Sequence, residues 1–297
     1  MATVTTHESA YAAAAMRLYP IEDATIAVRE QGTGPALVFI HGYPTHGYTW
    51  RHLLPRLSQS HRCVVVDLPG LGDSRWTGST DFRFTAQARR LCRLFETLGL
   101  ERYSILAHDT GATIARVVAL SHGERVARLA LINTEIPGHR PPFIQLYQRI
   151  AAMPGASLTF AMPMRLKAFR KSPMGFGEFY SDPVLFDDPD NLGPYVDPLL
   201  QSRARVEGAL AYLRGIEWDV VDGLREKHAQ IRARTMLIWG EDDKTFPVEL
   251  GEQMAAQFRP PARFVRIPNA SLMPHEERPS MVLDAVVPFL GEAETTS

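Results

Sequence analysis

The stretch YSILAHDTGA, residues 103–112, passes from an apolar strand pattern into the start of a helix pattern at Asp109. Small residues flank this aspartate, with Ala107 on one side and Gly111 on the other. A sharp strand-to-helix turn needs small neighbours, because larger side chains would collide with the adjacent backbone. The stretch therefore predicts an elbow that presents a carboxylate at a helix N-terminus. An ordinary helix N-cap remains the alternative interpretation, since aspartate often fills that position.

The position of Asp109 at the beginning of a helix also leads to an electrostatic expectation. The helix dipole and the free N–H groups of the first turn favour the ionised carboxylate. Burial in an apolar site would oppose ionisation. We expect the N–H donors to prevail and the Asp109 carboxylate to be ionised at neutral pH.

On both sides of the elbow, short apolar runs alternate with helical patterns, which predicts a mostly parallel sheet covered by helices. One helix is expected from Thr85 to Leu98, with apolar residues on one face at helical spacing. The expected fold class is α/β. The expected strands are Thr25–Arg29, Ala36–Ile40, Cys63–Val66, Tyr103–Ala107, Leu129–Ile132, Thr235–Trp239 and Phe264–Ile267.

The alternation stops between Ile136 and about His228, where ten of the chain's 22 prolines fall and no strong strand pattern occurs. This composition predicts a helical cap inserted into the sheet domain. We therefore expect one unit made of core residues 1–135, cap residues 136–228 and core residues 229–297. The aromatic residues and methionines of the cap can line an apolar pocket or pack the cap onto the core.

Composition narrows the classes of partner. The net charge is −1 and the basic residues are spread along the chain, which argues against recruitment by nucleic acid or an anionic membrane surface. Residues 1–16 lack the basic start and apolar centre of a secretion signal. The two cysteines, Cys63 and Cys92, suit neither a metal site nor a disulfide framework. These features predict a cytoplasmic protein without metal or cofactor that takes a small organic molecule; a homodimer is left open.

Three further motifs follow strands. His41-Gly42-Tyr43-Pro44 follows the strand that ends at Ile40, and Trp239-Gly240-Glu241-Asp242-Asp243 follows a later strand. The segment 67–74, DLPGLGDS, follows the strand between them, and we interpret it as structural. In doubly wound sheets, ligands bind at the carboxyl ends of the strands. These motifs and the elbow are therefore expected to meet at one edge of the sheet.

In their order and spacing, these motifs resemble the α/β hydrolases over nearly the whole chain outside the cap. The resemblance implies an oxyanion site formed by the backbone N–H groups of Tyr43 and Thr110. It also implies that Asp243 is the charge-relay acid, with Glu135 as the second candidate. An aspartate at the elbow resembles the epoxide hydrolases and haloalkane dehalogenases, which attack an electrophilic carbon with a carboxylate and form an ester.

The resemblance is closer to epoxide hydrolases than to dehalogenases. Dehalogenases commonly hold the halide with asparagine or tryptophan side chains at the positions where this chain has Tyr43 and Thr110. The arginine that follows the nucleophile in fluoroacetate dehalogenases is also replaced by Thr110. Epoxide hydrolases protonate the epoxide oxygen with tyrosines of the cap. Of the cap tyrosines in this chain, Tyr147, Tyr180, Tyr195 and Tyr212, we select Tyr180 and Tyr212 as candidates for substrate binding.

One family feature is missing. The catalytic histidine of this family follows a glycine, with a glutamate four residues later and a proline seven residues later. Glu276 and Pro279 set that register, which places Leu272 at the histidine position and Ser271 at the glycine position. His275 is a weak alternative base, and His41 and His108 stand where relatives carry structural histidines. Loss of the base removes an acid–base contribution of about 10² to 10⁴-fold.

Three hypotheses of function follow. In the first, Asp109 opens an epoxide or a related electrophile, and hydrolysis of the resulting ester is impaired or rerouted. In the second, the protein is a non-hydrolytic enzyme, such as a lyase, isomerase or cyclase, in which Asp109 acts as a base. In the third, it is a catalytically silent protein that binds a small molecule on the same fold.

Overall fold

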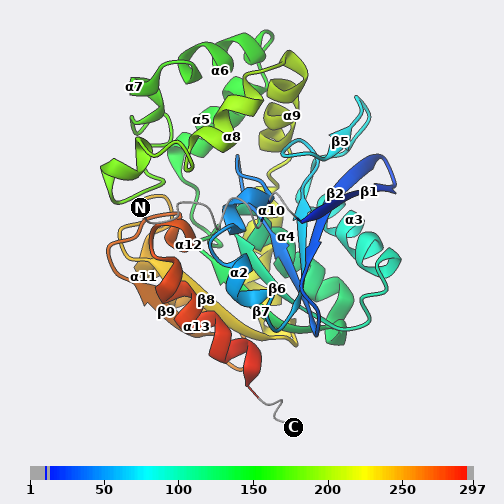
Figure 1. Cartoon of the computed structure of the whole chain (residues 1–297). Coiled ribbons are helices and arrows are strands. Elements are labelled where there is room, and N and C mark those ends of the chain that lie inside the picture. Colours follow the sequence, from blue (N-terminus) through cyan, green and yellow to red (C-terminus); the bar gives the residue numbers. More distant parts are fainter. Residues whose placement is uncertain (1–10, 12–13, 293–297) are drawn as a thin grey trace, which may run out of the picture.

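The protein is described by a computed structural model that covers residue 11 and residues 14–292, so most of the stretch considered as a possible secretion signal lies outside the described residues. One mixed sheet forms the centre, with the strand order β1-β2-β4-β3-β6-β7-β8-β9 and β5 paired with β2 (Figure 1). The strands are β1 (Ala15–Ile21), β2 (Ala24–Gln31), β3 (Ala36–Ile40), β4 (Arg62–Asp67), β5 (Arg75–Trp76), β6 (Tyr103–His108), β7 (Val126–Ile132), β8 (Arg234–Gly240) and β9 (Arg263–Ile267).

The sheet has a parallel part and an antiparallel edge. β4, β3, β6, β7, β8 and β9 run parallel, whereas β2 pairs antiparallel with β1, β4 and β5. All seven expected strands are present. β1 and β5 were not expected from the sequence: β1 is a mostly exposed edge strand that contains a proline, and β5 has only two residues.

Helices cover both faces of the sheet, as buried parallel strands require. In β3, Val38 and Ile40 belong to one hydrophobic cluster, and the alternating Leu37 and Phe39 belong to the other. The first cluster includes residues of α3, α4 and α11, and the second includes residues of α2 and α13. The bounds are α2 (Leu54–Leu57), α3 (Phe84–Thr97), α4 (Thr110–His122), α10 (Trp218–Lys227), α11 (Val248–Ala255), α12 (Pro274–Glu277), α13 (Pro279–Gly291), and the 3-10 turns η1 (Gly47–Trp50), η2 (Gly123–Arg125) and η4 (His228–Gln230).

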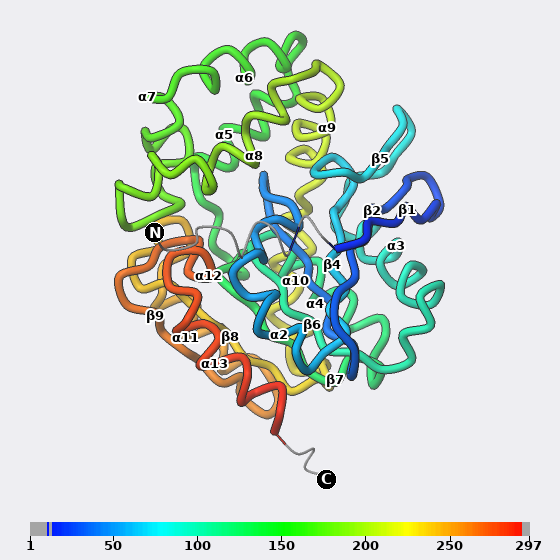
Figure 2. The backbone as a smooth tube through the Cα atoms, in the orientation of Figure 1, coloured from blue at the N-terminus to red at the C-terminus, as the bar shows by residue number. Residues whose placement is uncertain are grey.

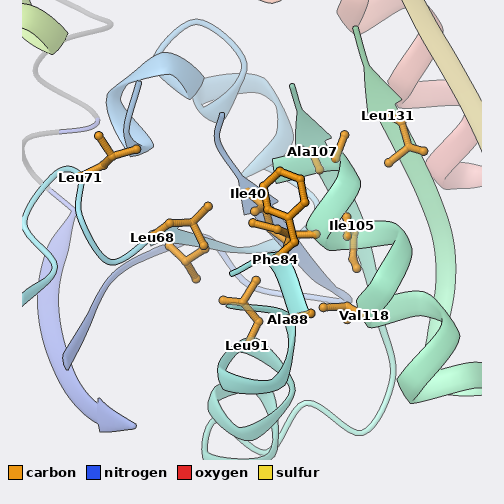
Figure 3. Packing of buried hydrophobic residues seen from close by; sticks show 14 of the residues in the cluster. Ile40, Leu68, Leu71, Phe84, Ala88, Leu91, Ile105, Ala107, Val118 and Leu131 are labelled. Carbon is orange, nitrogen blue, oxygen red and sulfur yellow. The ribbon is translucent and has the colours of Figure 1, made fainter. Parts of the chain in front are cut away.

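The expected helix at residues 85–98 corresponds to α3. Its buried residues include Phe84, Ala88 and Leu91, which recur at the spacing of one helix face. Figure 3 shows these side chains beside Ile40 of β3 and Ile105 of β6. This apolar layer fixes the position of α3 and α4 against the strands that carry the motifs.

Between β7 and β8 the described chain is helical. The helices are α5 (Pro142–Ala151), α6 (Ala156–Met164), α7 (Lys167–Arg170), η3 (Pro183–Phe186), α8 (Gly193–Leu199) and α9 (Arg203–Arg214). Here residues 142–214 are named the cap segment. Figures 1 and 2 show that this segment lies together at one end of the molecule, away from α13. α10, which falls inside the expected cap range, instead contacts α4. The domain boundaries at residues 136 and 228 therefore remain a prediction.

Within the described residues, no helix combines the length and apolarity needed to cross a bilayer. Cys63 is buried and Cys92 is half-buried, and both are free thiols. Burial raises the pKa of each thiol to about 12. Both thiols are therefore protonated at neutral pH and lack the thiolate character of a reactive cysteine.

Substitution of Gly111 tests how closely the first turn of α4 packs against the end of β3. A Cβ at this position would overlap the His41 and Ile40 carbonyl oxygens, so we expect Gly111→Ala to lower the free energy of unfolding by about 1–3 kcal/mol. Gly223 in α10 is a matched control, because a Cβ there meets nothing within 4 Å. Gly223→Ala should raise the free energy of unfolding by about 0.5–1 kcal/mol through helix propensity. Urea unfolding of both variants measures the difference, and equal effects would contradict the packing at Gly111.

Candidate active site

The elbow between β6 and α4 is built on an unusual backbone conformation at Asp109. This residue has φ 52° and ψ −132°, a conformation that side chains with a Cβ rarely adopt. Its N–H donates to the carbonyls of Ile132 (3.1 Å) and Asn133 (2.8 Å) at the end of β7. The Thr134 hydroxyl donates to the Asp109 carbonyl at 2.8 Å. These contacts hold a strained residue in place, as is common at functional sites.

The Asp109 carboxyl group points at the loop after β3. The Tyr43 N–H donates to its Oδ2 at 2.8 Å. This distance is possible because Gly42 has no side chain: a Cβ there would overlap the Asp109 carboxyl group. The Thr110 N–H is the second backbone donor to this carboxyl group. Of the two N–H groups expected to form the oxyanion site, that of Tyr43 therefore contacts Asp109 itself, and that of Thr110 lowers the pKa of the same carboxyl group.

A cavity of about 70 Å³ opens onto the carboxyl group. A bound water needs roughly 10–15 Å³ of such space, so the cavity has room for on the order of five small atomic groups. Among the residues that the structure describes, Asp109 is the only charged one in its wall. Residues of the core on the wall are Tyr43, Asp109, Thr110, Thr245 and Leu272, and those of the cap segment include Phe143, Ile144, Tyr147, Phe160, Met164, Phe176, Phe179 and Leu213.

Two tyrosine hydroxyls in this wall have no hydrogen-bond partner. They belong to Tyr43, on the loop after β3, and Tyr147, on α5; both oxygens are buried. Burial raises the pKa of Tyr43, and the nearby Tyr147 raises it further. Burial also raises the pKa of Tyr147. Because an unpaired buried hydroxyl is unfavourable, these two groups are available as donors to a ligand in the cavity.

The two tyrosines selected from the sequence lie elsewhere. The Tyr180 hydroxyl donates to Glu276 Oε2 at 2.7 Å, and Tyr180 is absent from the cavity wall, so its selection as a substrate-binding residue has no support from the geometry. The Tyr212 hydroxyl is 3.0 Å from Thr110 Oγ1, and its ring lies 5.7 Å from that of Tyr43. Tyr212 thus packs against the elbow but does not line the cavity. The choice among the cap tyrosines needed the fold of the cap segment, which the sequence pattern does not specify.

Leu272 lies in the cavity wall together with Asp109. Its backbone is held by His108, whose Nε2–H donates to the Leu272 carbonyl at 2.9 Å. His275 does not line the cavity: its Nε2 is 2.7 Å from Thr49 Oγ1, and its ring packs on Trp50 and His108. The geometry therefore gives His275 no contact with the cavity that a base would need.

Ser271, at the position where relatives have glycine, does not have a positive φ, and the nearby residue that does is Asn269, with φ 54°. The turn at Ser271 therefore does not need the conformational freedom of glycine in this chain. The Ser271 hydroxyl donates to the Glu178 carbonyl at 2.7 Å, which links the turn to the cap segment. Serine is accommodated without backbone strain.

His41 connects two loops. Its Nδ1–H donates to the Gly42 carbonyl at 2.8 Å, and its Nε2 accepts from the Leu68 N–H at 2.8 Å. Burial lowers the pKa of His41 to about 4. A neutral, fully hydrogen-bonded ring is part of the scaffold and is not available as a base.

Asp243 is buried near the end of β8. Its carboxyl group accepts from the N–H groups of Thr245 (2.8 Å) and Phe246 (3.0 Å) and from Asn133 Nδ2 (2.6 Å). Burial raises the pKa of Asp243 to about 7, although these donors lower it. Asp243 is close enough to Asp109 to raise the pKa of that residue as well.

The Glu135 side chain contacts α4 and does not line the cavity. Its Oε2 accepts from the hydroxyls of Thr113 (2.5 Å) and Thr134 (3.0 Å). Burial raises the pKa of Glu135, against the hydrogen bond from Thr113 and the positive charge of Arg116. No metal site of three or more His, Cys, Asp or Glu residues occurs among the described residues.

Comparison with known proteins agrees with this architecture. The profile of the α/β hydrolase fold matches residues 35–279. The chain belongs to the α/β-hydrolase fold family. This α/β hydrolase is 25% identical to epoxide hydrolase 2 of Caenorhabditis elegans, over 87% of this chain and 74% of the relative. It is 26% identical to haloalkane dehalogenase 2 of Mycobacterium tuberculosis, over 93% of this chain and 97% of the relative.

Among solved structures, this α/β hydrolase is similar to an α/β hydrolase fold protein from Burkholderia ambifaria. The TM-score is 0.79 at 23% identity, and the match covers 93% of this chain and 99% of that one. At that level of identity, the likeness concerns the fold alone. The homologues with assigned activities are therefore hydrolases, and two different reactions are represented among them.

The α/β hydrolase also has a buried polar network beside the Leu272 turn. Arg51 and Glu276 form an ion pair at 3.0 Å, with both side chains 1% exposed. Tyr180 and Tyr195 of the cap segment donate their hydroxyls to Glu276, and Arg51 Nη2 donates to Asn191 Oδ1 at 2.7 Å. Although burial opposes it, Arg51 and these hydroxyls hold the pKa of Glu276 below its ordinary value. The network joins the cap segment to the core with all its charges paired.

The electrostatics of Asp109 differ from the expectation. Burial raises the pKa of Asp109 well above its ordinary value, and the negative charges of Glu135 and Asp243 raise it further. The N–H groups of Tyr43 and Thr110 lower this pKa but do not prevail. The expectation that the donors would win is wrong in direction, because two N–H groups do not replace the hydration that the apolar cavity removes. In the part of the chain that the structure describes, no cation lines the cavity to offset this rise in pKa.

Asp109→Asn should change how stability depends on pH. A carboxyl group with a raised folded-state pKa contributes stability below its unfolded pKa of about 4, and that contribution is lost as the pH rises through the folded pKa. The parent protein should therefore lose stability from about pH 4 towards and beyond neutrality, whereas Asp109→Asn should lose less. Urea unfolding at a series of pH values between about 5 and 8 measures the two slopes.

Asp222→Asn serves as the control for that series. The Asp222 carboxyl is partly exposed, and its pKa is held below the ordinary value, against burial, by Arg140 and the Gly138 N–H. Its contribution is present above about pH 4 and is lost on acidification, so Asp222→Asn should not flatten the slope between about pH 5 and 8. If the free energy of unfolding changes with pH in the same way for Asp109→Asn and for the parent, the pKa of Asp109 is not raised.

Proposed function

We propose that this protein is an epoxide hydrolase-like α/β hydrolase in which Asp109 opens a small electrophilic substrate. The observation that carries this proposal is the Asp109 carboxyl group at the elbow, hydrogen-bonded to the Tyr43 N–H and open to an apolar cavity. A carboxylate in a dry cavity is a stronger nucleophile than one in water, because no hydration shell has to be removed during attack. The cavity favours a small apolar substrate over a charged one.

In the first step, a carboxylate oxygen of Asp109 forms a bond to a ring carbon of the epoxide, and the bond between that carbon and the epoxide oxygen breaks. The negative charge moves to the former ring oxygen. Tyr43 and Tyr147 are proposed to donate hydrogen bonds to this oxygen, because their hydroxyls are unpartnered and line the same cavity. The oxygen takes its proton from one of them, and the tyrosinate is reprotonated from solvent when the cavity opens.

An epoxide fits this donor set better than a haloalkane does. Tyrosine hydroxyls are strong donors to an oxygen that gains charge as the ring opens. The side chains at positions 43 and 110, a tyrosine and a threonine, supply no amide or indole N–H of the kind inferred for halide binding. Dehalogenation is therefore the second candidate within the same proposal.

In the second step, water must attack the ester carbonyl carbon. The N–H groups of Tyr43 and Thr110 are suited to stabilise the oxyanion of that carbonyl group. Leu272 cannot take a proton from the attacking water, and no histidine of the described part of the chain lines the cavity. The ester is therefore expected to persist, with hydrolysis slower by about 10² to 10⁴-fold than with a positioned base.

The raised pKa of Asp109 favours a second candidate of another class. A buried carboxyl group whose pKa is raised can hold a proton and pass it between two positions of a bound substrate. Such a site would catalyse an isomerisation or a cyclisation with no ester and no water consumed. A silent binding protein is the third possibility, and the intact mass and the product distinguish all three.

Incubation with small epoxides and haloalkanes should produce a covalent adduct on Asp109. An epoxide should add its whole mass, and a haloalkane should add its mass less that of the hydrogen halide. Because only the ionised carboxylate attacks, the rate of adduct formation should rise with pH through the raised pKa of Asp109. Intact-mass spectrometry over time measures this rate. Product without adduct would support the isomerase candidate, and neither adduct nor product would support the binding protein.

The same measurement on substituted proteins tests the roles of Asp109 as nucleophile and of Tyr43 and Tyr147 as hydrogen-bond donors. Asp109→Asn should abolish the adduct. The double variant Tyr43→Phe with Tyr147→Phe should slow adduct formation by on the order of 10²-fold, as expected for loss of donors to a developing oxyanion. Tyr19→Phe on the edge strand β1 is the matched control and should leave the rate unchanged. If the double variant also retains the parent rate, the two hydroxyls do not assist ring opening.

Leu272→His should create or greatly raise turnover. The backbone at position 272 is already fixed by His108, and the buried Asp243 is available to orient the new imidazole. Since Ser271 needs no glycine conformation, Leu272→His alone should suffice, and Ser271→Gly should add little. The measurement is release of diol and loss of the adduct, with recovery of part of a roughly 10² to 10⁴-fold effect.

Leu272→Asn is the control, because it introduces polarity and similar volume without a base. Both variants need to be folded, as judged by thermal unfolding. If Leu272→His forms the adduct and yet releases no more product than Leu272→Asn, the missing histidine is not what limits hydrolysis. The isomerase candidate would then replace the hydrolase.

A further inference from the structure

The outer surface of the cap segment exposes large apolar side chains. Seven of the nine exposed large hydrophobic residues in the described chain lie between Leu146 and Val184. Four of them are consecutive along α6 and its flanks: Met153 (59% exposed), Leu158 (68%), Met162 (58%) and Leu166 (63%). We name these four residues the α6 patch. Single exposed leucines are ordinary on protein surfaces, whereas a contiguous cluster indicates an interaction site.

The α6 patch has the spacing of one helix face. Leu158 and Met162 are four residues apart on α6, and Leu166 continues the same interval just beyond its end. The opposite side of α6 is apolar as well, since Phe160 and Met164 are buried and line the cavity. A helix that is apolar on all sides is expected to be covered on all sides. Figure 1 shows α6 at the end of the molecule farthest from α13, with no other element outside it.

The charged residues in the chain segment around the α6 patch are all basic. From Gly138 to Gly177 the sequence contains no aspartate or glutamate. Arg149, Arg165 and Lys167 are exposed in this range, and none of them has an ion pair among the described residues. Two further cations, Arg170 and Lys171, are paired with acidic residues. The net charge of −1 for the whole chain therefore conceals a local excess of positive charge beside the α6 patch.

We infer that the α6 patch docks on the surface of an anionic lipid bilayer. Apolar side chains that protrude beside unpaired lysine and arginine match the two parts of such a surface, the acyl boundary and the negative headgroups. A second copy of the chain fits less well. In a two-fold dimer through this face, the same cations would oppose each other. The inference departs from the expectation, based on the net charge and on the spread of basic residues along the chain, that no membrane surface is involved.

Docking of this kind would connect the bilayer to the cavity. The helix whose outer side carries Leu158 and Met162 presents Phe160 and Met164 to the cavity on its inner side. An apolar substrate is concentrated in the bilayer relative to water, because transfer of apolar surface out of water is favourable. The docked cap segment would thus lie against the phase that holds such a substrate. The docking itself does not depend on which reaction Asp109 performs.

Sedimentation with lipid vesicles tests the inference on the full chain. The protein should bind vesicles of phosphatidylglycerol and phosphatidylcholine in equal parts and should bind pure phosphatidylcholine vesicles much less. Arg165→Glu with Lys167→Glu should lower the partition coefficient on the anionic vesicles by about tenfold or more. Leu158→Gln with Met162→Gln should have an effect of similar size. Added salt should weaken binding, because it screens the headgroup charge.

The control uses an equivalent pair on another surface. Met16 and Arg17 on β1 are an exposed apolar residue and an exposed cation, so Met16→Gln with Arg17→Glu should leave binding unchanged. All variants alter exposed side chains, and thermal unfolding establishes that each is folded. Equal binding to both kinds of vesicle, or no binding to either, overturns the inference. A dimer in solution that Leu158→Gln with Met162→Gln dissociates would also overturn it and would assign the patch to a second copy.

Discussion

The close approach of two loops, one after β3 and one after β6, is the constraint on which the site depends. A single hydrogen bond, from the Tyr43 N–H to Asp109 Oδ2 at 2.8 Å, marks that approach. It requires glycine on both sides of the contact, because a Cβ on Gly42 or Gly111 would overlap the facing loop. The positive φ of Asp109 and the anchoring of its backbone to the end of β7 follow from the same geometry. The parallel strands supply the rigid frame that brings these loops to one edge.

That geometry also produces the electrostatic character of the cavity. The elbow places a carboxyl group where apolar side chains exclude water and two other buried acids are near. The buried ion pair of Arg51 and Glu276 lies beside the Leu272 turn. The positive charge of Arg51 lowers the pKa of Glu276. Arg51 joins the cap segment to the core through Glu276, and among the described residues no cation lines the cavity beside Asp109. A carboxyl group in this state can act as acid or nucleophile according to pH.

Much of the fold was predictable from the sequence, because buried parallel strands are apolar runs bounded by turns. β3 was predicted with its observed bounds, while β1 was missed because exposed edge residues and Pro20 give no apolar alternation. The elbow could be placed from local spacing, whereas the Tyr43 donor and the Leu272 position were inferred from the resemblance to the α/β hydrolases. The roles of Tyr180 and Tyr147 could not be predicted, since they depend on how the cap segment folds over the sheet. The charge state of Asp109 also depends on distant residues, including Glu135 and Asp243.

The turn that carries Leu272 is held entirely through its backbone and its neighbours. The Ser271 N–H donates to Glu277 at 2.6 Å, the Leu272 carbonyl accepts from His108 at 2.9 Å, and the Met273 N–H donates to the Phe179 carbonyl at 3.2 Å. None of these hydrogen bonds involves the side chain at position 272, which is buried and lines the cavity. In evolutionary terms, a leucine codon can become a histidine codon by a single base change. Such a change at position 272 would leave the backbone hydrogen bonds of the turn in place.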